Sequence, residues 1–419
     1  MQEDWLRTGM RLLGTLPHTA GDALRGKYAA WKASNKLRHP LRELPWNAGS
    51  AAAALAEAER MLSMSGRGMR TPAEDTLHSE EDLELVEHIH SETAKHNRSN
   101  VTRTAAYLEC YNNCPELHWA LLAHMVSRNG GYNMTDLKGG LMADLVTGKE
   151  KDWTYRLLER CNALIFQDAY PQLLLYAHSR RLGRSCFHLL PFFHVSAFMS
   201  PFWERFWTLR DSPLLTVALI INEQHYIEGR VMRNPYFRKH VTRSTTFRMH
   251  NWLQLNQVVF PLGQDSGLAG LIIEQFADLG ERIALGKCLY ALLFGYEQVL
   301  TRTLDFARKV PHRGSRSEYW PGLFTPDIEK ALHSPHESTA LHSREWPISG
   351  RKLYSPALEQ VWSDTPYEPI PRYDWFEGYL NPSYLSKPRR PFLFEMTHEH
   401  KFGIQKTAVG HDTEALLFQ

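Results

Sequence analysis

One strongly apolar helical segment of the sequence contains polar residues that could do chemistry. Residues 116–138 begin with a stretch that would be apolar on nearly every face of a helix, and such helices are usually buried. His118, His124, Arg128 and Asn129 stand within that stretch, so they need partners inside the protein. A histidine there could act as a general base and an arginine could hold an anion. This segment is the first candidate site.

Helical spacing limits what the two histidines can do together. His118 and His124 are six residues apart, which places them about 120° apart around a helix. They therefore cannot form the same-face pair of a zinc-binding helix, whereas His124 and Arg128 share a face. The competing interpretation is a pair of core histidines that are hydrogen-bonded to the backbone.

The end of the segment allows two interpretations. Gly130 and Gly131 suit a helix end. Two glycines also permit the backbone to approach a ligand closely, beside Tyr132, Asn133 and Asp136.

A second polar patch follows an apolar helix. Residues 214–221 are apolar on all faces, and Asn222 and Glu223 come directly after them. A carboxylate in such a place is paired, neutral or held for chemistry. His225 and Glu228 are three apart, a spacing compatible with two ligands of one metal. The alternative is a helix whose second half emerges into solvent.

Other polar groups are weaker candidates. Arg103 could pair with Glu109, Asp136 or Glu223. Residues 230–252 combine arginines with aromatic residues, which suits phosphate binding with base stacking, although a solvated basic face is the commoner explanation. Cys110, Cys114 and His118 are spaced four and four, but Pro115 should break that helix.

Composition favours an intracellular protein. The formal net charge of the 419 residues is only +2, which argues against nucleic acid as the partner. Five scattered cysteines indicate a reducing compartment rather than a disulfide framework. The start of the sequence lacks the charge order of a signal peptide, and no run of about 18 apolar residues occurs. We therefore expect a cytoplasmic location and no membrane span.

Cap and periodicity signals predict a mainly α fold, an irregular multi-helix bundle with a wrap rich in proline and aromatic residues at the C-terminal end. We expect an N-terminal helical region over 1–75, a helical core over 76–310 and a loop-rich region over 311–419 packed on the core. Within the core, separate helices are expected over 152–167 and 171–182, one opening at Asp211, and a long helical stretch over roughly 268–309.

Several of these segments resemble one known family. Residues 116–120 (ELHWA), 124–131 (HMVSRNGG) and 133–137 (NMTDL) resemble the signature of the YppC-like family of bacilli, and 100–104 (NVTRT) and 221–224 (INEQ) are similar too. The resemblance spans roughly residues 80–400. It implies a bacterial, cytoplasmic protein, and because the family is a domain of unknown function it supplies no catalytic residues.

Three functions remain open. The first is an enzyme that acts on a small anionic substrate by acid/base or metal-assisted hydrolysis, in a pocket where the two patches meet. The second is a non-catalytic interaction or scaffold protein, and the third is nucleic-acid binding through 230–252. The candidate catalytic residues are His118, His124 and Glu223. The candidate binding residues are Arg103, Arg128, Asn129, Tyr132, Asn133, Asp136, Asn222, His225 and Glu228. The sequence assigns no metal, cofactor or oligomeric state.

Overall fold

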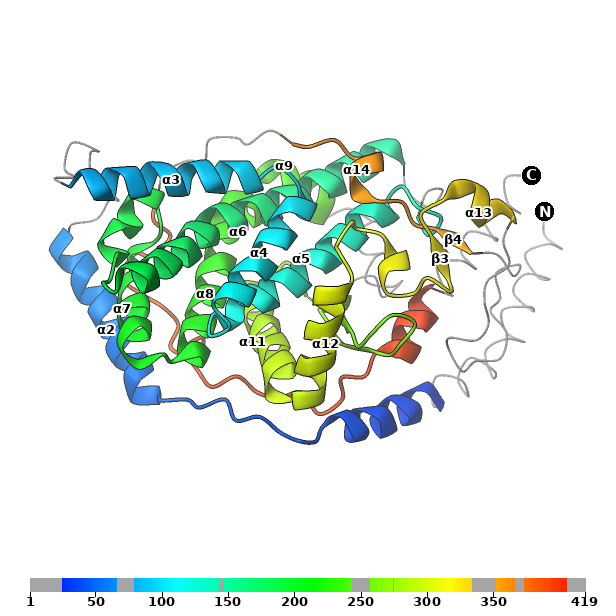
Figure 1. Ribbon diagram of the computed structural model, residues 1–419, viewed down its shortest axis with the longest axis horizontal. Coiled ribbons are helices and arrows are strands. Elements are labelled where there is room, and N and C mark those ends of the chain that lie inside the picture. Colours follow the sequence, from blue (N-terminus) through cyan, green and yellow to red (C-terminus); the bar gives the residue numbers. More distant parts are fainter. Residues whose placement is uncertain are drawn as a thin grey trace.

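Helices dominate the computed structural model, which confirms the predicted fold class (Figure 1). The structure describes residues 25–65, 79–142, 147–242, 257–273, 275–333, 352–365 and 373–404. The labelled helices are α2 (Ala48–Ser65), α3 (Glu80–His96), α4 (Asn100–Asn113), α5 (His118–Asp136), α6 (Gly148–Leu182), α7 (Ser200–Leu209), α8 (Ser212–Ile227), α9 (Pro235–Phe237), α11 (Leu279–Gly295), α12 (Glu297–Lys309), α13 (Ile328–His333) and α14 (Leu358–Val361). Residues 25–37 and 397–404 are helical as well. Within the described ranges, no helix combines the length and the apolar character that crossing a membrane requires.

Short 3₁₀ and π-helical turns connect several of these helices. The 3₁₀ turns are η2 (Phe187–Phe193), η3 (Ala197–Met199) and η6 (Arg316–Glu318), and the π-helical turns are η4 (Glu228–Met232) and η5 (Arg238–Thr242). Helix α8 begins at the predicted start signal, because the Asp211 side chain accepts a hydrogen bond from the Leu214 amide at 3.0 Å.

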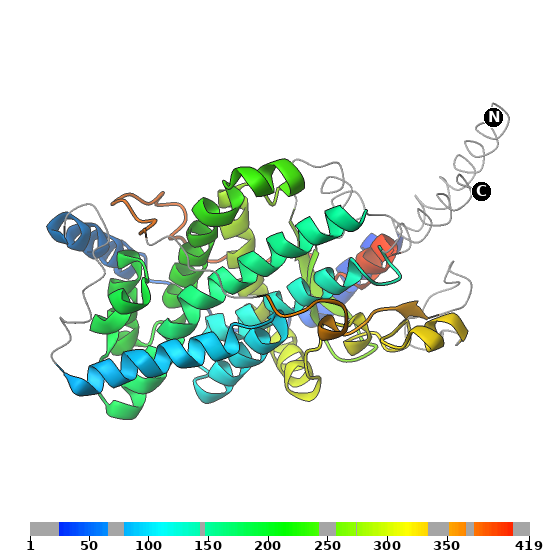
Figure 2. The same cartoon turned by 90° about the horizontal axis from the view of Figure 1, so that it is seen from above.

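Helix α6 forms the long axis of the bundle. Its 35 residues correspond to about 50 Å, and Figures 1 and 2 show it running along the length of the molecule. The Thr147 side chain caps its first turn, and Gly183 ends it in the left-handed conformation with φ +70°. The helices α3, α4, α5 and α8 pack against it.

The sequence prediction of two helices separated at Pro171 is wrong. Proline removes one backbone hydrogen bond and costs about 3 kcal/mol in a helix interior. Here the helix continues because Tyr170, Pro171 and Leu173 are all buried, so tertiary packing holds both halves in line. The prediction of a helix end at Gly130 and Gly131 is also wrong, since α5 continues to Asp136.

The expected helical stretch over 268–309 is only partly helical. Its first residues form β2 (Leu268–Ile272), which pairs antiparallel with β1 (Gln257–Pro261) in the register Val259 to Gly270. A Cβ at Gly270 would lie 2.3 Å from the Val258 carbonyl oxygen, so the hairpin requires glycine there. The second two-stranded sheet pairs β3 (Phe324–Thr325) in parallel with β4 (Leu353–Tyr354).

The C-terminal segment wraps the helical body as predicted. Residues 352–365 contain only β4 and α14 as regular elements, and residues 373–396 are mostly turns and irregular backbone. The orange-to-red trace in Figure 1 follows the bundle over most of its length. We call residues 352–365 and 373–396 the strap. Hydrogen bonds hold the strap against the helices: Lys287 on α11 donates to the Tyr384 carbonyl at 2.8 Å, and Tyr296 donates to the Pro391 carbonyl at 2.8 Å.

Candidate functional site

Arg128 joins helix α5 to the chain that follows α12. Its guanidinium donates to the Glu318 carboxylate at 2.5 Å, to the Val310 carbonyl at 2.7 Å and to the Tyr132 hydroxyl at 3.1 Å. Tyr132 donates in turn to the same carboxylate at 3.1 Å. Because Arg128 is fully buried and its donors are directed to protein acceptors, its charge is neutralised within the fold.

The two glycines of α5 serve close packing within the protein. A Cβ at Gly131 would lie 2.5 Å from both His312 Nε2 and Asn100 Oδ1, and these two atoms are 2.9 Å apart. The other ring nitrogen of His312 lies 3.2 Å from Glu318. The close approach that the sequence suggested for a ligand is therefore made by a buried histidine.

His124 and His118 lie in separate environments, each bonded to a structural partner. His124 Nδ1 donates to the Thr104 carbonyl at 2.7 Å, while His118 Nδ1 is 3.0 Å from the Tyr290 hydroxyl, with its ring stacked on Phe294. Burial lowers the pKa of each histidine to about 3, with a smaller contribution from a nearby arginine. Both imidazoles are neutral at pH 7, and so low a pKa makes them weak bases.

The remaining candidates on α5 anchor neighbouring segments. Asn129 exchanges two hydrogen bonds with the backbone of Val259, at 2.8 and 2.9 Å, and so fixes strand β1. Asp136 accepts from Arg316 Nε and Nη2 at 2.8 and 2.5 Å, and Asn133 accepts from the same guanidinium at 3.4 Å.

Glu223 links the two polar patches of the sequence. It lies on α8 and accepts hydrogen bonds from Trp119 Nε1 of α5 at 3.0 Å and from the Gln224 amide at 3.1 Å. The pKa of Glu223 is raised to about 8, chiefly by burial, with a smaller contribution from the Asp168 carboxyl and with the hydrogen bonds from Gln224 and Trp119 acting in the opposite direction. The carboxyl is therefore mainly protonated at pH 7.

Asn222 connects α8 to α6 and to the strap. Its amide donates to Asp168, and its carbonyl oxygen accepts from Trp375 Nε1 at 2.8 Å. Burial raises the pKa of Asp168 to about 7.

His225 and Glu228 do not converge on a common point. The His225 ring stacks on Trp375 at 4.2 Å between centroids, whereas Glu228 accepts from Arg282 at 2.5 Å and from Arg233 at 3.0 Å. Throughout the part of the chain that the structure describes, no three histidine, cysteine, aspartate or glutamate residues are grouped to hold a metal ion.

The basic segment 230–252 is described only as far as residue 242, so Arg243, Phe247, Arg248 and Trp252 lie outside the described residues. Arg230 is buried, donates to the carbonyls of Tyr226 and Tyr373, and packs over both rings. Tyr236 and Phe237 of the same segment face a pocket beside α6.

Arg103 is one of the predicted residues, and it contacts two residues that line this pocket. It lies on α4 and pairs with none of the three acids that the sequence suggested. Its Nη2 donates to Glu159 Oε1 of α6 at 2.5 Å, and its Nη1 donates to Asn97 Oδ1 at 3.1 Å. Both acceptor residues line the pocket.

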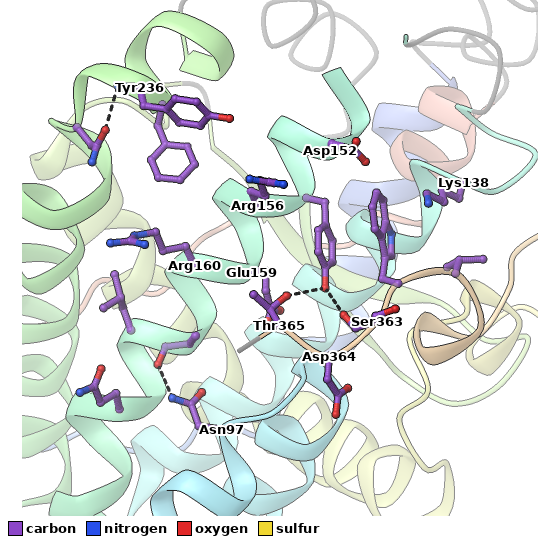
Figure 3. Close-up of a pocket in the computed structure, with 18 residues that line it drawn as sticks. Asn97, Lys138, Asp152, Arg156, Glu159, Arg160, Tyr236, Ser363, Asp364 and Thr365 are labelled. Carbon is purple, nitrogen blue, oxygen red and sulfur yellow. Dashed lines mark hydrogen bonds between the residues drawn. The ribbon is translucent and has the colours of Figure 1, made fainter. Parts of the chain in front are cut away.

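The pocket has a volume of about 810 Å³ and lies between α6, the turn at α9 and the strap (Figure 3). None of the twelve residues predicted from the sequence lines it. Its lining residues are Asn97, Lys138, Asp152, Tyr155, Arg156, Glu159, Arg160, Ala163, Leu164, Gln167, Asn234, Tyr236, Phe237, Val361, Trp362, Ser363, Asp364 and Thr365.

The strap forms one wall of this α6 pocket through specific contacts. Trp362 stacks on Tyr155 with centroids 4.0 Å apart and donates from Nε1 to the Met134 carbonyl at 2.9 Å. The Tyr155 hydroxyl donates to the Ser363 carbonyl at 3.2 Å. Lys138 lies over the other side of the Trp362 ring, 3.9 Å from its centroid. The wall is therefore held in place by rings and backbone bonds.

Helical spacing along α6 could have indicated this wall. Tyr155 and Glu159 are four residues apart, as are Arg156 and Arg160, so each pair shares a face. Such a stripe is ordinarily interpreted as a solvated helix face. The strap that converts it into a pocket lies some 200 residues away in the sequence.

Comparison with known proteins gives a family and no activity. A family described as "Protein of unknown function (DUF2515)" matches residues 95–407. The "Uncharacterized protein YppC" of Bacillus subtilis (strain 168) is 38% identical over 313 residues, which cover 75% of this chain and 90% of that protein. No solved structure matches. The match confirms the resemblance seen in the motifs, and the chain belongs to the DUF2515 family of proteins of unknown function.

Proposed function

We propose that this protein binds a small anionic ligand in the α6 pocket and that it does so inside the cell. The observation that carries the proposal is the position of Arg156 on the pocket wall, with Arg160 one helical turn further along α6. Arg156 is exposed to solvent and makes no hydrogen bond or ion pair with the described residues. A guanidinium without a protein partner in a concave site is a ready receptor for carboxylate or phosphate.

The charges around the pocket favour an anion. Lys138, Arg156 and Arg160 contribute three positive charges, while the buried Glu159 is neutralised by its ion pair with Arg103. Asp152 and Asp364 remain, and Asp364 lies 4.0 Å from Arg98. Exposed charges are well screened, so the gain from each contact is modest, but a concave surface focuses the field on a ligand.

Binding, rather than catalysis, is the core of the proposal. His118, His124 and Glu223 do not line the pocket, and each is engaged by other side chains or by the backbone. A carboxylate that served an acid/base or metal-assisted reaction on the ligand would have to be Asp152, Glu159 or Asp364, which do line it.

Isothermal titration with a panel of small anions (phosphate, sulfate, citrate and sugar phosphates) tests the proposal. Arg156→Gln should weaken the binding of any anion that the protein takes up by about tenfold, the typical effect of one charge-assisted hydrogen bond. Lys149→Gln is the matched control, because it removes one charge from the exposed first turn of α6 outside the pocket. Equal losses in both variants, or no binding at all, would remove the proposal.

A non-catalytic interaction protein is the second candidate. It is favoured by the internal partners that all twelve predicted residues have, which is the pattern of a fixed scaffold. Native mass spectrometry of the protein purified from its own host separates the two candidates. A bound mass of a few hundred daltons supports the ligand, and a bound protein supports the scaffold.

A further inference from the structure

Glu159 at the base of the α6 pocket has one carboxylate oxygen without a partner. The residue is only 3% exposed, and Arg103 occupies its Oε1 at 2.5 Å. Its Oε2 is buried and accepts no hydrogen bond from the described residues. Leaving a buried charged acceptor unsatisfied is costly, so a donor on a bound ligand would be strongly favoured there.

The charges around Glu159 indicate which kind of donor fits. Arg103 already neutralises the carboxylate, and Arg156 and Arg160 add two further cations on the same helix. An ammonium group would be repelled by these three guanidinium groups. A hydroxyl donates without carrying a charge, so it suits Glu159 Oε2 better than an ammonium group does.

The arginines provide a phosphate site next to this acceptor. Arg156 and Arg160 are one helical turn apart and share a face, and Glu159 is on the adjoining face. Figure 3 shows Arg156 and Arg160 on the Tyr236 side of the pocket and Glu159 nearer to Ser363 and Thr365. Two guanidinium groups at this spacing suit the several oxygens of one phosphate.

We infer that the anionic ligand is a phosphorylated sugar, with its phosphate bound by Arg156 and Arg160 and a ring hydroxyl donating to Glu159 Oε2. This inference rests on the proposed function and specifies the class of ligand. The sugar phosphate could be free or part of a nucleotide. The volume of about 810 Å³ has room for either, and the exposed Tyr236 on the pocket wall offers a ring on which a base could stack.

The test is isothermal titration of the full chain with three probes. Ribose 5-phosphate carries phosphate and hydroxyls, methyl phosphate carries only the phosphate, and adenosine monophosphate adds a base. We expect ribose 5-phosphate or the nucleotide to bind at least tenfold more tightly than methyl phosphate, the effect of one hydrogen bond to a charged acceptor. Preference between these two probes identifies the source of the sugar phosphate.

Two variants assign the effect to the named residues. Glu159→Gln should reduce the advantage over methyl phosphate to less than about threefold, because the charged acceptor is lost. Arg156→Gln should weaken all three probes alike. If Glu159→Gln does not fold, the comparison of probes on the native protein, together with Arg156→Gln on the exposed helix face, decides the question.

The possible results distinguish a failure of the sugar-phosphate inference from a failure of the proposed anion binding. Equal affinity for methyl phosphate and ribose 5-phosphate overturns the sugar while leaving anion binding in place. Binding of citrate or sulfate without binding of any phosphate ester has the same meaning. Absence of binding for every anion overturns both.

Discussion

Replacing Glu223 by glutamine should change how the stability of the protein depends on pH. The pKa of Glu223 is raised to about 8 in the fold, from 4.5 for a free side chain, chiefly by burial. The folded protein therefore keeps a proton that the unfolded chain releases above pH 4.5. Because the unfolded state binds fewer protons over this window, the free energy of unfolding falls as the pH rises from 4.5 to 8.

The size of the effect follows from the pKa difference. One pKa unit corresponds to about 1.4 kcal/mol, so the full shift amounts to about 5 kcal/mol above pH 8. Between pH 6 and pH 9 the wild type should lose about 2.5 kcal/mol more than Glu223→Gln, because the folded carboxyl ionises near the middle of this interval. The Asp168 carboxyl is retained in both proteins, so its own titration largely cancels in the difference.

Urea unfolding at pH 6, 7, 8 and 9 measures this difference. Absolute stability is not the readout, because a glutamine amide accepts hydrogen bonds from Trp119 and Gln224 differently from a carboxyl. The readout is the slope of the difference against pH. Glu84→Gln, on the exposed face of α3, is the control and should parallel the wild type. Parallel curves for Glu223→Gln and the wild type would show that Glu223 is ionised in the fold and would refute the reasoning.

Three further predictions concern the buried networks. Gly131→Ala should lower the free energy of unfolding by about 1–3 kcal/mol, because the new Cβ would lie 2.5 Å from a ring nitrogen and an amide oxygen; Gly148→Ala, with nothing within 4 Å, should be neutral or stabilising in the same thermal melts. Arg128→Ala should cost about 3–5 kcal/mol in urea unfolding, since Glu318 would keep a buried charge without its partner, and a loss below 1 kcal/mol would contradict that pairing. His124→Asn should make the free energy of unfolding less sensitive to acid. The pKa of His124 is about 3 in the fold and 6.5 in the unfolded chain, so between pH 6.5 and 4.5 the wild type should lose about 2 kcal/mol of stability that the variant keeps. Equal losses in the two proteins over this pH range would argue against a neutral buried imidazole.

The sequence predicted the helical class well because its signals are local. Asp211 caps α8 where expected, and apolar periodicity identifies the buried faces. The prediction of secondary structure failed where the conformation depends on contacts with segments that are distant in the sequence. The turn between β1 and β2 contains Gly263 with φ +131° and Asp265 with φ 47°, a glycine-rich turn signal before Leu268. Without the partner strand, however, the short apolar run after it suits a helix equally well.

For the candidate residues too, the sequence shows which side chains need a partner but does not show which residue that partner is. The rule that buried polar groups need partners correctly singled out Arg103 and Arg128, but spacing cannot identify the partners. Arg103 pairs with Glu159 across 56 residues, and Arg128 pairs with Glu318 across 190. A helical wheel describes one helix, whereas the α6 pocket is assembled from α6, α9 and the strap.

The polar segment on α5 is best understood as the support of the α6 pocket. Asn100 on α4 donates to the Ser127 carbonyl of α5 at 2.9 Å, and Arg103, one turn further along α4, holds Glu159 on α6. Trp362 of the opposite wall donates to a carbonyl of the same α5, that of Met134. Helix α5 thus fixes the position of one pocket wall through α4 and of the other directly. A rigid support of this kind is what a small polar ligand requires, because two guanidinium groups and a carboxylate bind it well only when their separation is fixed before it arrives.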